Sequence, residues 1–171
     1  MNTNYAIDTS MLDPALHPTP LVIPQPYTLL SGHEVGQWVA DRACEGRYDA
    51  KTSVSIGLLR GERIIAGAIF NNWNHASVQL HMAIERMNRQ FLIALAHYAF
   101  IQLAANVVVA PVSSANDKSQ HALEHAGFKL EACITAGHPD GDLLLYVLPF
   151  HACRFLNASY FSRRIGDAHG W

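Results

Sequence analysis

Alternating apolar and polar residues predict three strands in the first half of the chain. Residues 53–60 alternate, and residues 63–70 return after a two-residue turn at Gly61-Glu62. Residues 78–85 alternate again, with a period that fits a strand better than a helix. Because strand side chains point to opposite faces in turn, this last strand should have one apolar face and one more polar face.

Two further segments have residues that typically start and end helices. Ser31 with Glu34 forms a capping box at the start of a helix that runs to about Cys44. Asn116 opens a later helix, and Gly127 ends it with the left-handed conformation that glycine adopts easily.

A longer helix is predicted between these two, and Asn88 is its cap. Its apolar stripe has the spacing i, i+3, i+4, i+7 and i+11, formed by Leu92, Leu95, Ala96, Ala99 and Leu103. Residues 107–110 follow as an apolar run without alternation, which is typical of a strand covered on both faces.

Residues 27–30, 129–135 and 143–148 complete the predicted strands, and the last two are joined by a turn at 138–141. The order is strand, helix, three strands, helix, strand, helix and two strands. Residues 78–109 then form a βαβ unit, whose two strands should be parallel neighbours. The sequence therefore predicts an α/β protein (α+β, with a mixed sheet) whose central sheet is flanked by helices.

Composition divides the chain and limits its function. Residues 1–26 hold five of the eight prolines and predict an extended arm, residues 27–156 the folded domain, and residues 157–171 a tail. Half of the 171 residues are hydrophobic and the net charge is −2. The hydrophobic content is enough to bury a core. Because the net charge is slightly negative, broad electrostatic binding to nucleic acid or to an anionic membrane is not expected. With no apolar run long enough to span a membrane, we expect a cytoplasmic protein.

The cysteines and histidines form no recognisable metal motif. Cys44, Cys133 and Cys153 are far apart, which disfavours a disulfide framework or a cysteine-rich zinc site. The ten histidines are scattered. His121 and His125 have a possible ligand spacing, but no third ligand stands nearby, so surface histidines are the simpler interpretation and no metal is expected.

The stretch that begins at Ser114 resembles a motif of the GNAT acyltransferase superfamily. It has an Asn after a strand (Asn116), a small residue three positions later (Ser119), and a Gly127-Phe128 pair that closes the helix. With the order of elements, the resemblance covers residues 27–148 and implies the GNAT acyl-CoA N-acyltransferase fold. The same pieces occur in unrelated α/β proteins, because Asn caps helices and Gly ends them.

Other residues resemble GNAT-like proteins encoded by phages and prophages. These proteins carry an aromatic, Asn-rich loop, a His on the middle strand and a Cys-Arg pair near the end, represented here by Asn72, Trp73, Asn74, His81, Cys153 and Arg154. The resemblance implies a cytoplasmic protein, or a virion-associated one if the chain is a phage component.

The resemblance implies acetyl-CoA, as the acyl-CoA co-substrate, in a cleft between strands 78–85 and 107–112. In this family the first strand has a bulge whose amides bind the pantetheine arm and polarise the thioester. The matching residues are Met82, Ala83 and Ile84. Asn116 and Ser119 match the next motif, with a hydrogen bond from Asn116 to pantetheine or substrate expected.

The resemblance also implies that the diphosphate of acetyl-CoA lies at the start of the long helix, where the free backbone N–H groups of the first turn favour an anion. Residues 85–91 lack the glycines that the family usually has there. The residues at this place are Arg86, Asn88, Arg89 and Gln90. The two arginines could contact phosphates or be ordinary surface residues. A second departure is Leu123, where many members carry a tyrosine that protonates the leaving thiolate.

His81 and Glu85 are the candidate general bases, and Gln79 lies on the same strand face. An imidazole can take the ammonium proton near neutral pH, directly or through water. His81 could instead form hydrogen bonds within a polar layer. Trp73 and Gln79 are candidates for contact with the acceptor, although Trp73 could also cover core residues.

Two functions from different classes fit these residues. The first is an N-acetyltransferase that moves an acetyl group from acetyl-CoA to a small-molecule or protein amine by direct attack. The second is a catalytically silent GNAT-fold binding or structural protein, such as a phage component held in an assembly by its proline-rich arm. The expected macromolecular partner is a second copy, in a homodimer, or a phage assembly. Nucleic-acid binding is the least favoured, and no membrane partner is expected.

Overall fold

The computed structural model of the chain describes residues 26–43 and 46–156. All of the predicted arm except Pro26 lies outside these ranges, as do the predicted tail 157–171 and Cys44.

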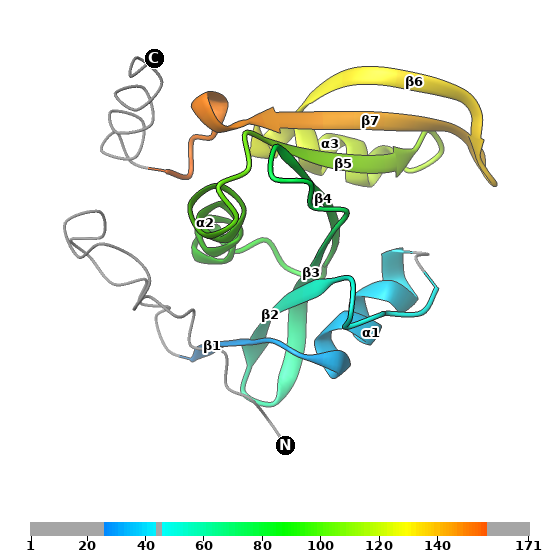
Figure 1. Cartoon of the computed structure of the whole chain (residues 1–171). Helices are drawn as coiled ribbons and strands as arrows, with labels where there is room; N and C mark the ends of the chain where they lie inside the picture. Colours follow the sequence, from blue (N-terminus) through cyan, green and yellow to red (C-terminus); the bar gives the residue numbers. More distant parts are fainter. Residues whose placement is uncertain (1–25, 44–45, 157–171) are drawn as a thin grey trace, which may run out of the picture.

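One seven-stranded sheet organises the described residues (Figure 1). Its strands are β1 (Tyr27–Leu30), β2 (Val54–Arg60), β3 (Arg63–Asn71), β4 (Ser77–Ile84), β5 (Val107–Ser113), β6 (Lys129–His138) and β7 (Gly141–Pro149). The spatial order is β1-β2-β3-β4-β5-β7-β6. Only β4 and β5 are parallel; every other neighbouring pair is antiparallel. The predicted mixed sheet, element order and βαβ unit are therefore confirmed.

Helices cover both faces of the sheet. They are α1 (His33–Ala43), α2 (Arg89–His97), α3 (Asp117–Ala126) and a 3-10 helix (Phe150–Ala152); α2 continues into a π-helical turn (Tyr98–Gln102). In Figure 1, α1 and α2 lie on opposite sides of β2, β3 and β4. Residues of α2 and α3 share one apolar core with β2–β5 and β7, whereas α1 packs on a smaller cluster on the other face.

Glycines on the sheet allow α1 to approach it closely. A Cβ built on Gly67 would lie 2.5 Å from a methyl group of Val39, and one on Gly57 would lie 2.8 Å from a methyl group of Val35. Real Cβ atoms essentially never come so close to another heavy atom. The two glycines, one on β2 and one on β3, therefore allow α1 to lie close to these strands.

The start of α1 differs from the prediction. The helix begins at His33, and Gly32 accepts the first helical hydrogen bond from the N–H of Gly36 at 3.0 Å. Gly32 has φ +133°, a conformation that favours glycine, and its N–H donates to the Ser55 hydroxyl at 3.2 Å. The predicted capping box at Ser31 is therefore wrong. The Ser55 side chain of β2 bonds to Gly32, the residue after Ser31, and the helix begins one residue later than predicted.

The burial of β5 also corrects the prediction. Val108 and Ala110 are buried, but Val107 and Val109 are only half-buried. The helix α1 packs on one face of β2, β3 and β4. It does not extend far enough to cover the same face of β5. The strand is therefore not covered equally on both faces, although its apolar run suggested this.

Candidate functional site

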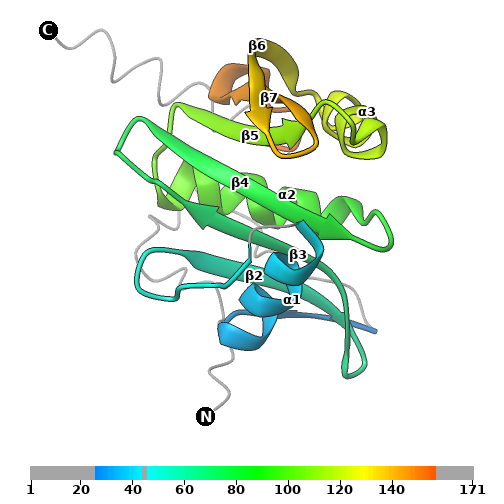
Figure 2. The ribbon, with the colours of Figure 1, turned by 90° about the vertical axis from the view of Figure 1, so that its right-hand side faces the viewer.

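Strands β4 and β5 separate part of the way along their length. Their parallel ladder consists of the pairs Ser77–Val107, Val78–Val108 and Gln79–Val109, after which β4 continues to Ile84 and β5 to Ser113. Figure 2 shows the two ribbons diverging beyond the paired end. A cavity of about 520 Å³ lies where they separate.

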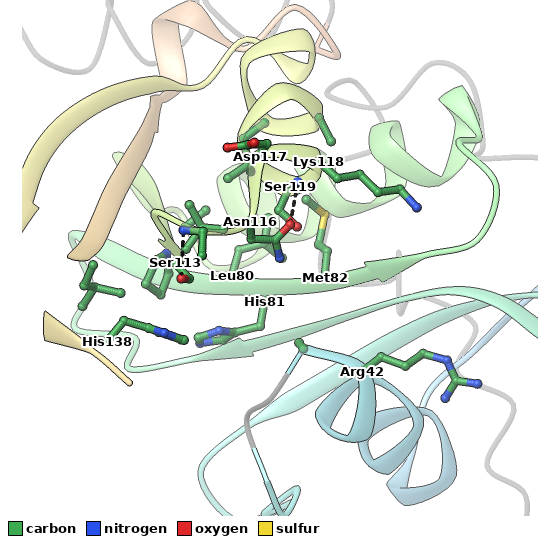
Figure 3. A pocket seen from close by; sticks show the side chains of 18 of the residues that line it. Arg42, Leu80, His81, Met82, Ser113, Asn116, Asp117, Lys118, Ser119 and His138 are labelled. Carbon is green, nitrogen blue, oxygen red and sulfur yellow. Dashed lines mark hydrogen bonds between the residues drawn. The ribbon is translucent and has the colours of Figure 1, made fainter. Parts of the chain in front are cut away.

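The cavity reaches both faces of the sheet (Figure 3). Leu80, Met82 and Ile84 line it from the face that packs against α2, whereas His81 and the end of α1 line it from the opposite face. The first turn of α3 supplies a third wall. Two molecules entering from opposite faces of the sheet could therefore meet in it.

The β3–β4 register shows which β4 amides point into the gap. The N–H of Glu85 donates to the carbonyl of Ile65 at 3.0 Å, which makes these residues a hydrogen-bonded pair. Such pairs alternate along an antiparallel ladder. The N–H groups of Met82 and Ile84 therefore point away from β3, into the gap, whereas that of Ala83 points toward β3. This geometry favours the first two predicted residues over the third.

The bulge that the resemblance implied in β4 is absent. The register between β3 and β4 is unbroken from Asn71–Gln79 to Ala66–Ile84. The irregularity lies between β2 and β3 instead, at Leu58–Leu59. No bulge is needed to expose amides of β4, because the loss of the β5 partner exposes them.

His81 lies on the wall of the cavity, with 7% of its surface exposed. Its backbone pairs with Ile69 of β3, which is in the cluster under α1. The strand alternation that predicted its face is therefore confirmed. His81 is therefore a buried imidazole in the cavity wall, on the face of β4 that lies under α1.

The start of α3 forms the wall opposite β4. The Asn116 side-chain oxygen accepts the N–H of Ser119 at 3.0 Å, so the predicted cap is confirmed, and Gly127 ends the helix with φ +100°. Asn116 and Ser119 both line the cavity. Since the cap uses only the oxygen of Asn116, its side-chain NH₂ is left to contact a ligand. Leu123 is buried and also lines the cavity, where it offers no proton.

A second hollow, of about 360 Å³, lies beside the start of α2. Its lining includes Met87 and Arg89 from this end of α2 and His125, Arg154 and Phe155 from the region around the end of α3. Arg154 also donates to the carbonyl of His125. Arg89, the first residue of α2, and Arg154 thus line one hollow, and arginine side chains beside a helix start can hold an anion.

The remaining residues predicted at the α2 start lie in different environments. Asn88 accepts the N–H of Phe91 at 3.1 Å, which confirms it as the helix cap. Arg86 is exposed and lines neither hollow, and neither does Gln90. Of the two predicted arginines, the structure therefore places only Arg89 at the hollow.

Three residues predicted for catalysis or for contact with the acceptor lie away from the cavity lining. Glu85 accepts a hydrogen bond from Arg63 at 2.6 Å in an exposed ion pair. Gln79 accepts from the Asn72 amide at 2.8 Å, and the exposed Trp73 packs against His75 with ring centroids 4.3 Å apart. The structure does not bring these three together with His81.

Sequence reasoning missed His138, which lines the cavity from the end of β6. Figure 3 shows its ring turned toward that of His81. The signal in the sequence was weak, because His138 is one of ten scattered histidines and stands at a turn. The β6–β7 hairpin curves so that His138, near its turn, lines the same cavity as His81 of β4 (Figure 1).

The described cysteines do not contribute a nucleophile to the cavity lining. Burial raises the pKa of the Cys153 thiol, which keeps it protonated, and Cys133 is exposed on β6. Among residues 26–43 and 46–156, no group of three His, Cys, Asp or Glu side chains could hold a metal ion. In the same part of the chain, no helix is long and apolar enough to cross a membrane.

Comparisons with known proteins place this arrangement among acetyltransferase structures. No protein-family model and no curated protein sequence matches the chain. A mutant spermidine N-acetyltransferase from Vibrio cholerae is 15% identical, with a TM-score of 0.61 over 80% of this chain and 99% of that one. A dodecameric form of spermidine N-acetyltransferase from Vibrio cholerae is 14% identical, with a TM-score of 0.61 over 78% of this chain and 98% of that one.

A further structure is described as a probable acetyltransferase. It is 21% identical, with a TM-score of 0.52 over 58% of this chain and 62% of that one. None of these structures bears on the resemblance to phage-encoded proteins, which stays a prediction. The mixed seven-stranded sheet and its parting central strands, together with these similarities, show that the chain has the GNAT acetyltransferase fold.

Proposed function

We propose that the chain transfers an acetyl group from acetyl-CoA to an amine by direct attack, with both substrates bound at once. The observation that carries the proposal is the cavity between β4 and β5, which opens to both faces of the sheet. It supplies a meeting place for two substrates, and the buried His81 lies in its wall. The GNAT fold supports the same reaction class.

The thioester carbonyl would be held by the exposed amides of β4. The N–H groups of Met82 and Ile84 point into the gap, where the ladder no longer uses them. Backbone donors fixed in a sheet need no reorganisation as negative charge develops on the carbonyl oxygen. Asn116 and Ser119 face these donors from the other side of the cavity and could hold the pantetheine arm.

The amine would attack the acetyl carbon directly. His81 removes the ammonium proton, the C–N bond forms and the C–S bond breaks. The proton that the nitrogen loses after attack can pass to the leaving thiolate, so Leu123 need not be replaced by another acid. Neither described cysteine suits a covalent acetyl-cysteine path, because burial raises the pKa of the Cys153 thiol and Cys133 lies exposed on β6, outside the cavity lining. Cys44 lies outside the described residues.

The hollow at the start of α2 fits the diphosphate. Arg89 and Arg154 give it positive charge, and the helix start adds partial positive charge. The glycines usual in this family are absent from residues 85–91, so side-chain cations would replace close backbone contacts. The absent glycines and Leu123 are the features that the catalytically silent alternative has in its favour, and the arm that it invokes lies, except for Pro26, outside the described residues.

Binding and turnover test the proposal separately. Calorimetric titration with acetyl-CoA and with CoA measures whether the co-substrate binds, and micromolar affinity is the expected result. Thiol release from acetyl-CoA, followed with a panel of amines, then measures transfer. Spermidine belongs in this panel because it is the substrate named for two similar structures. Absence of binding at millimolar concentration would overturn the acetyltransferase assignment and favour the silent alternative.

Arg89→Glu should weaken binding of CoA about thirtyfold. The change removes a cation from the hollow and places a carboxylate near the diphosphate, at a cost of about 2 kcal/mol. Arg86→Glu is the matched control, because Arg86 is exposed on the same loop but does not line the hollow. Equal affinity of the two variants, with unchanged circular dichroism, would place the phosphates elsewhere.

A further inference from the structure

His138 is held at the cavity by an irregularity between β6 and β7, next to the turn that joins them. Between the pairs Ile134–Leu143 and His138–Gly141, β6 advances by four residues while β7 advances by two. Such a bulge turns the side chains that follow it in a new direction. Its geometry is fixed by the Asp142 carboxylate, which accepts the N–H of Ala136 at 2.9 Å.

The hairpin tip is also tied to the loop before α3. The N–H of Asp142 donates to the Ser114 hydroxyl at 2.9 Å, and the N–H of Ser114 donates to the Asp142 carbonyl at 2.8 Å. A Cβ at Gly141 would lie 2.7 Å from the same hydroxyl oxygen, so the close approach requires glycine. His138 therefore stands on a tip that is anchored beside the cavity wall.

The ring of His138 has a defined proton arrangement. Its Nδ1 accepts the N–H of Asp140 at 3.1 Å, so the neutral ring carries its proton on Nε2. The Asp140 carboxylate lies 3.8 Å from the same Nδ1 and can pair with the ring when it becomes charged. The His138 side chain is 26% exposed and that of Asp140 is 73% exposed, so this pair connects the cavity to solvent.

His81, by contrast, is buried and must lose its proton once in each cycle. Among the described residues, the other charged groups that line the cavity are Arg42 from α1, Asp117 and Lys118 from α3, and Asp140 from the β6–β7 turn. Figure 3 shows Arg42 and Lys118 extending away from His81. His138 is the group in the figure whose titratable ring faces it.

We propose that His138 is a second imidazole of the proton path: it takes the proton that His81 has removed from the amine and passes it to solvent. This inference rests on the proposed function. Transfer of acetyl from acetyl-CoA to a protonated amine yields the amide, the free thiol and one proton. That proton moves from the amine to His81 and then, through water, to Nδ1 of His138, the ring nitrogen that carries no proton. It leaves Nδ1 for solvent beside the Asp140 carboxylate, so both imidazoles return to their starting state.

His138→Ala should lower kcat about tenfold in dilute buffer, less than the hundredfold low end for a base that acts directly. The KM and affinity for acetyl-CoA should stay unchanged, because His138 contacts the proton path and not the diphosphate hollow. Added imidazole should restore most of the rate, since it can enter the space left by the ring. His151→Ala, which removes an exposed histidine outside the cavity lining, should change neither the rate nor its response to imidazole.

A second variant separates proton transfer from folding. His138→Gln can still accept a hydrogen bond but cannot relay a proton, so it should be slow while its thermal stability stays at the wild-type value. A wild-type rate for His138→Ala at every buffer concentration, or a loss that imidazole does not repair, would overturn the relay while acetyl transfer stands. An inactive wild-type protein with every amine would overturn the proposed function first, and the relay with it.

Discussion

His81→Gln should lower turnover about a hundredfold, the low end for removal of a general base. Glutamine keeps the polarity and much of the shape of the imidazole but cannot take a proton near neutral pH. The affinity for acetyl-CoA should stay nearly the same, because the predicted thioester and diphosphate contacts belong to other residues. Steady-state rates of thiol release, measured with an amine that wild-type protein accepts, provide the comparison.

The pH profile distinguishes a base from a structural residue at position 81. At subsaturating amine, the wild-type rate should rise with pH, and His81→Gln should remove most of this rise. A structural role would instead lower thermal stability and the affinity for acetyl-CoA together, since His81 is buried beside the cluster under α1. A variant with the wild-type rate and pH profile would show that the amine arrives already deprotonated.

Local signals predicted most of the fold because they act over a few residues. Asn88 and Asn116 accept the N–H three residues later, and Gly127 has the left-handed conformation that its position suggested. The cap predicted at Ser31 was wrong because the start of this helix depends on a residue that is distant in the sequence. The hydroxyl of Ser55, on β2, bonds with Gly32 and fixes where the helix begins.

Strand alternation predicted the face of each β4 residue but not its distance from the gap. Gln79 lies where β5 still pairs with β4, so the gap has not yet opened there. Glu85 follows the end of β4 and pairs with Arg63. His81 lies between these two positions, beside the opening of the gap. A periodic pattern carries no information about where two strands separate, since this depends on the packing of β5 against β7 and α3.

His138 illustrates a different limit. Its approach to His81 depends on a bulge in β6, on the two hydrogen bonds between Ser114 and Asp142, and on the close contact at Gly141. Each of these is a tertiary feature of the hairpin. The turn itself was predicted, but the direction in which the hairpin curves was not encoded in any local motif.

The start of α2 shows how an apparent defect in a motif can be a stable local structure. The sequence between β4 and α2 was notable for the glycines that it lacks. In the structure, Asn88 caps the helix, and Phe91, whose N–H this cap holds, is completely buried. The predicted apolar stripe began one residue later, at Leu92, which is only half-buried. Phe91 therefore anchors the turn that presents Arg89 to the hollow.

Phe91→Ala should lower the free energy of unfolding by about 3–5 kcal/mol, because it removes a fully buried aromatic ring from a packed core. Urea denaturation followed by circular dichroism measures the change. Met87→Ala is the matched control: this apolar side chain in the same stretch is 47% exposed, and its removal should change stability by less than about 0.5 kcal/mol. Because the loosened turn carries Arg89, the variant should also bind CoA more weakly under conditions where it remains folded. A loss below about 1 kcal/mol would show that the core closes around the missing ring, and that the cap alone holds the start of α2.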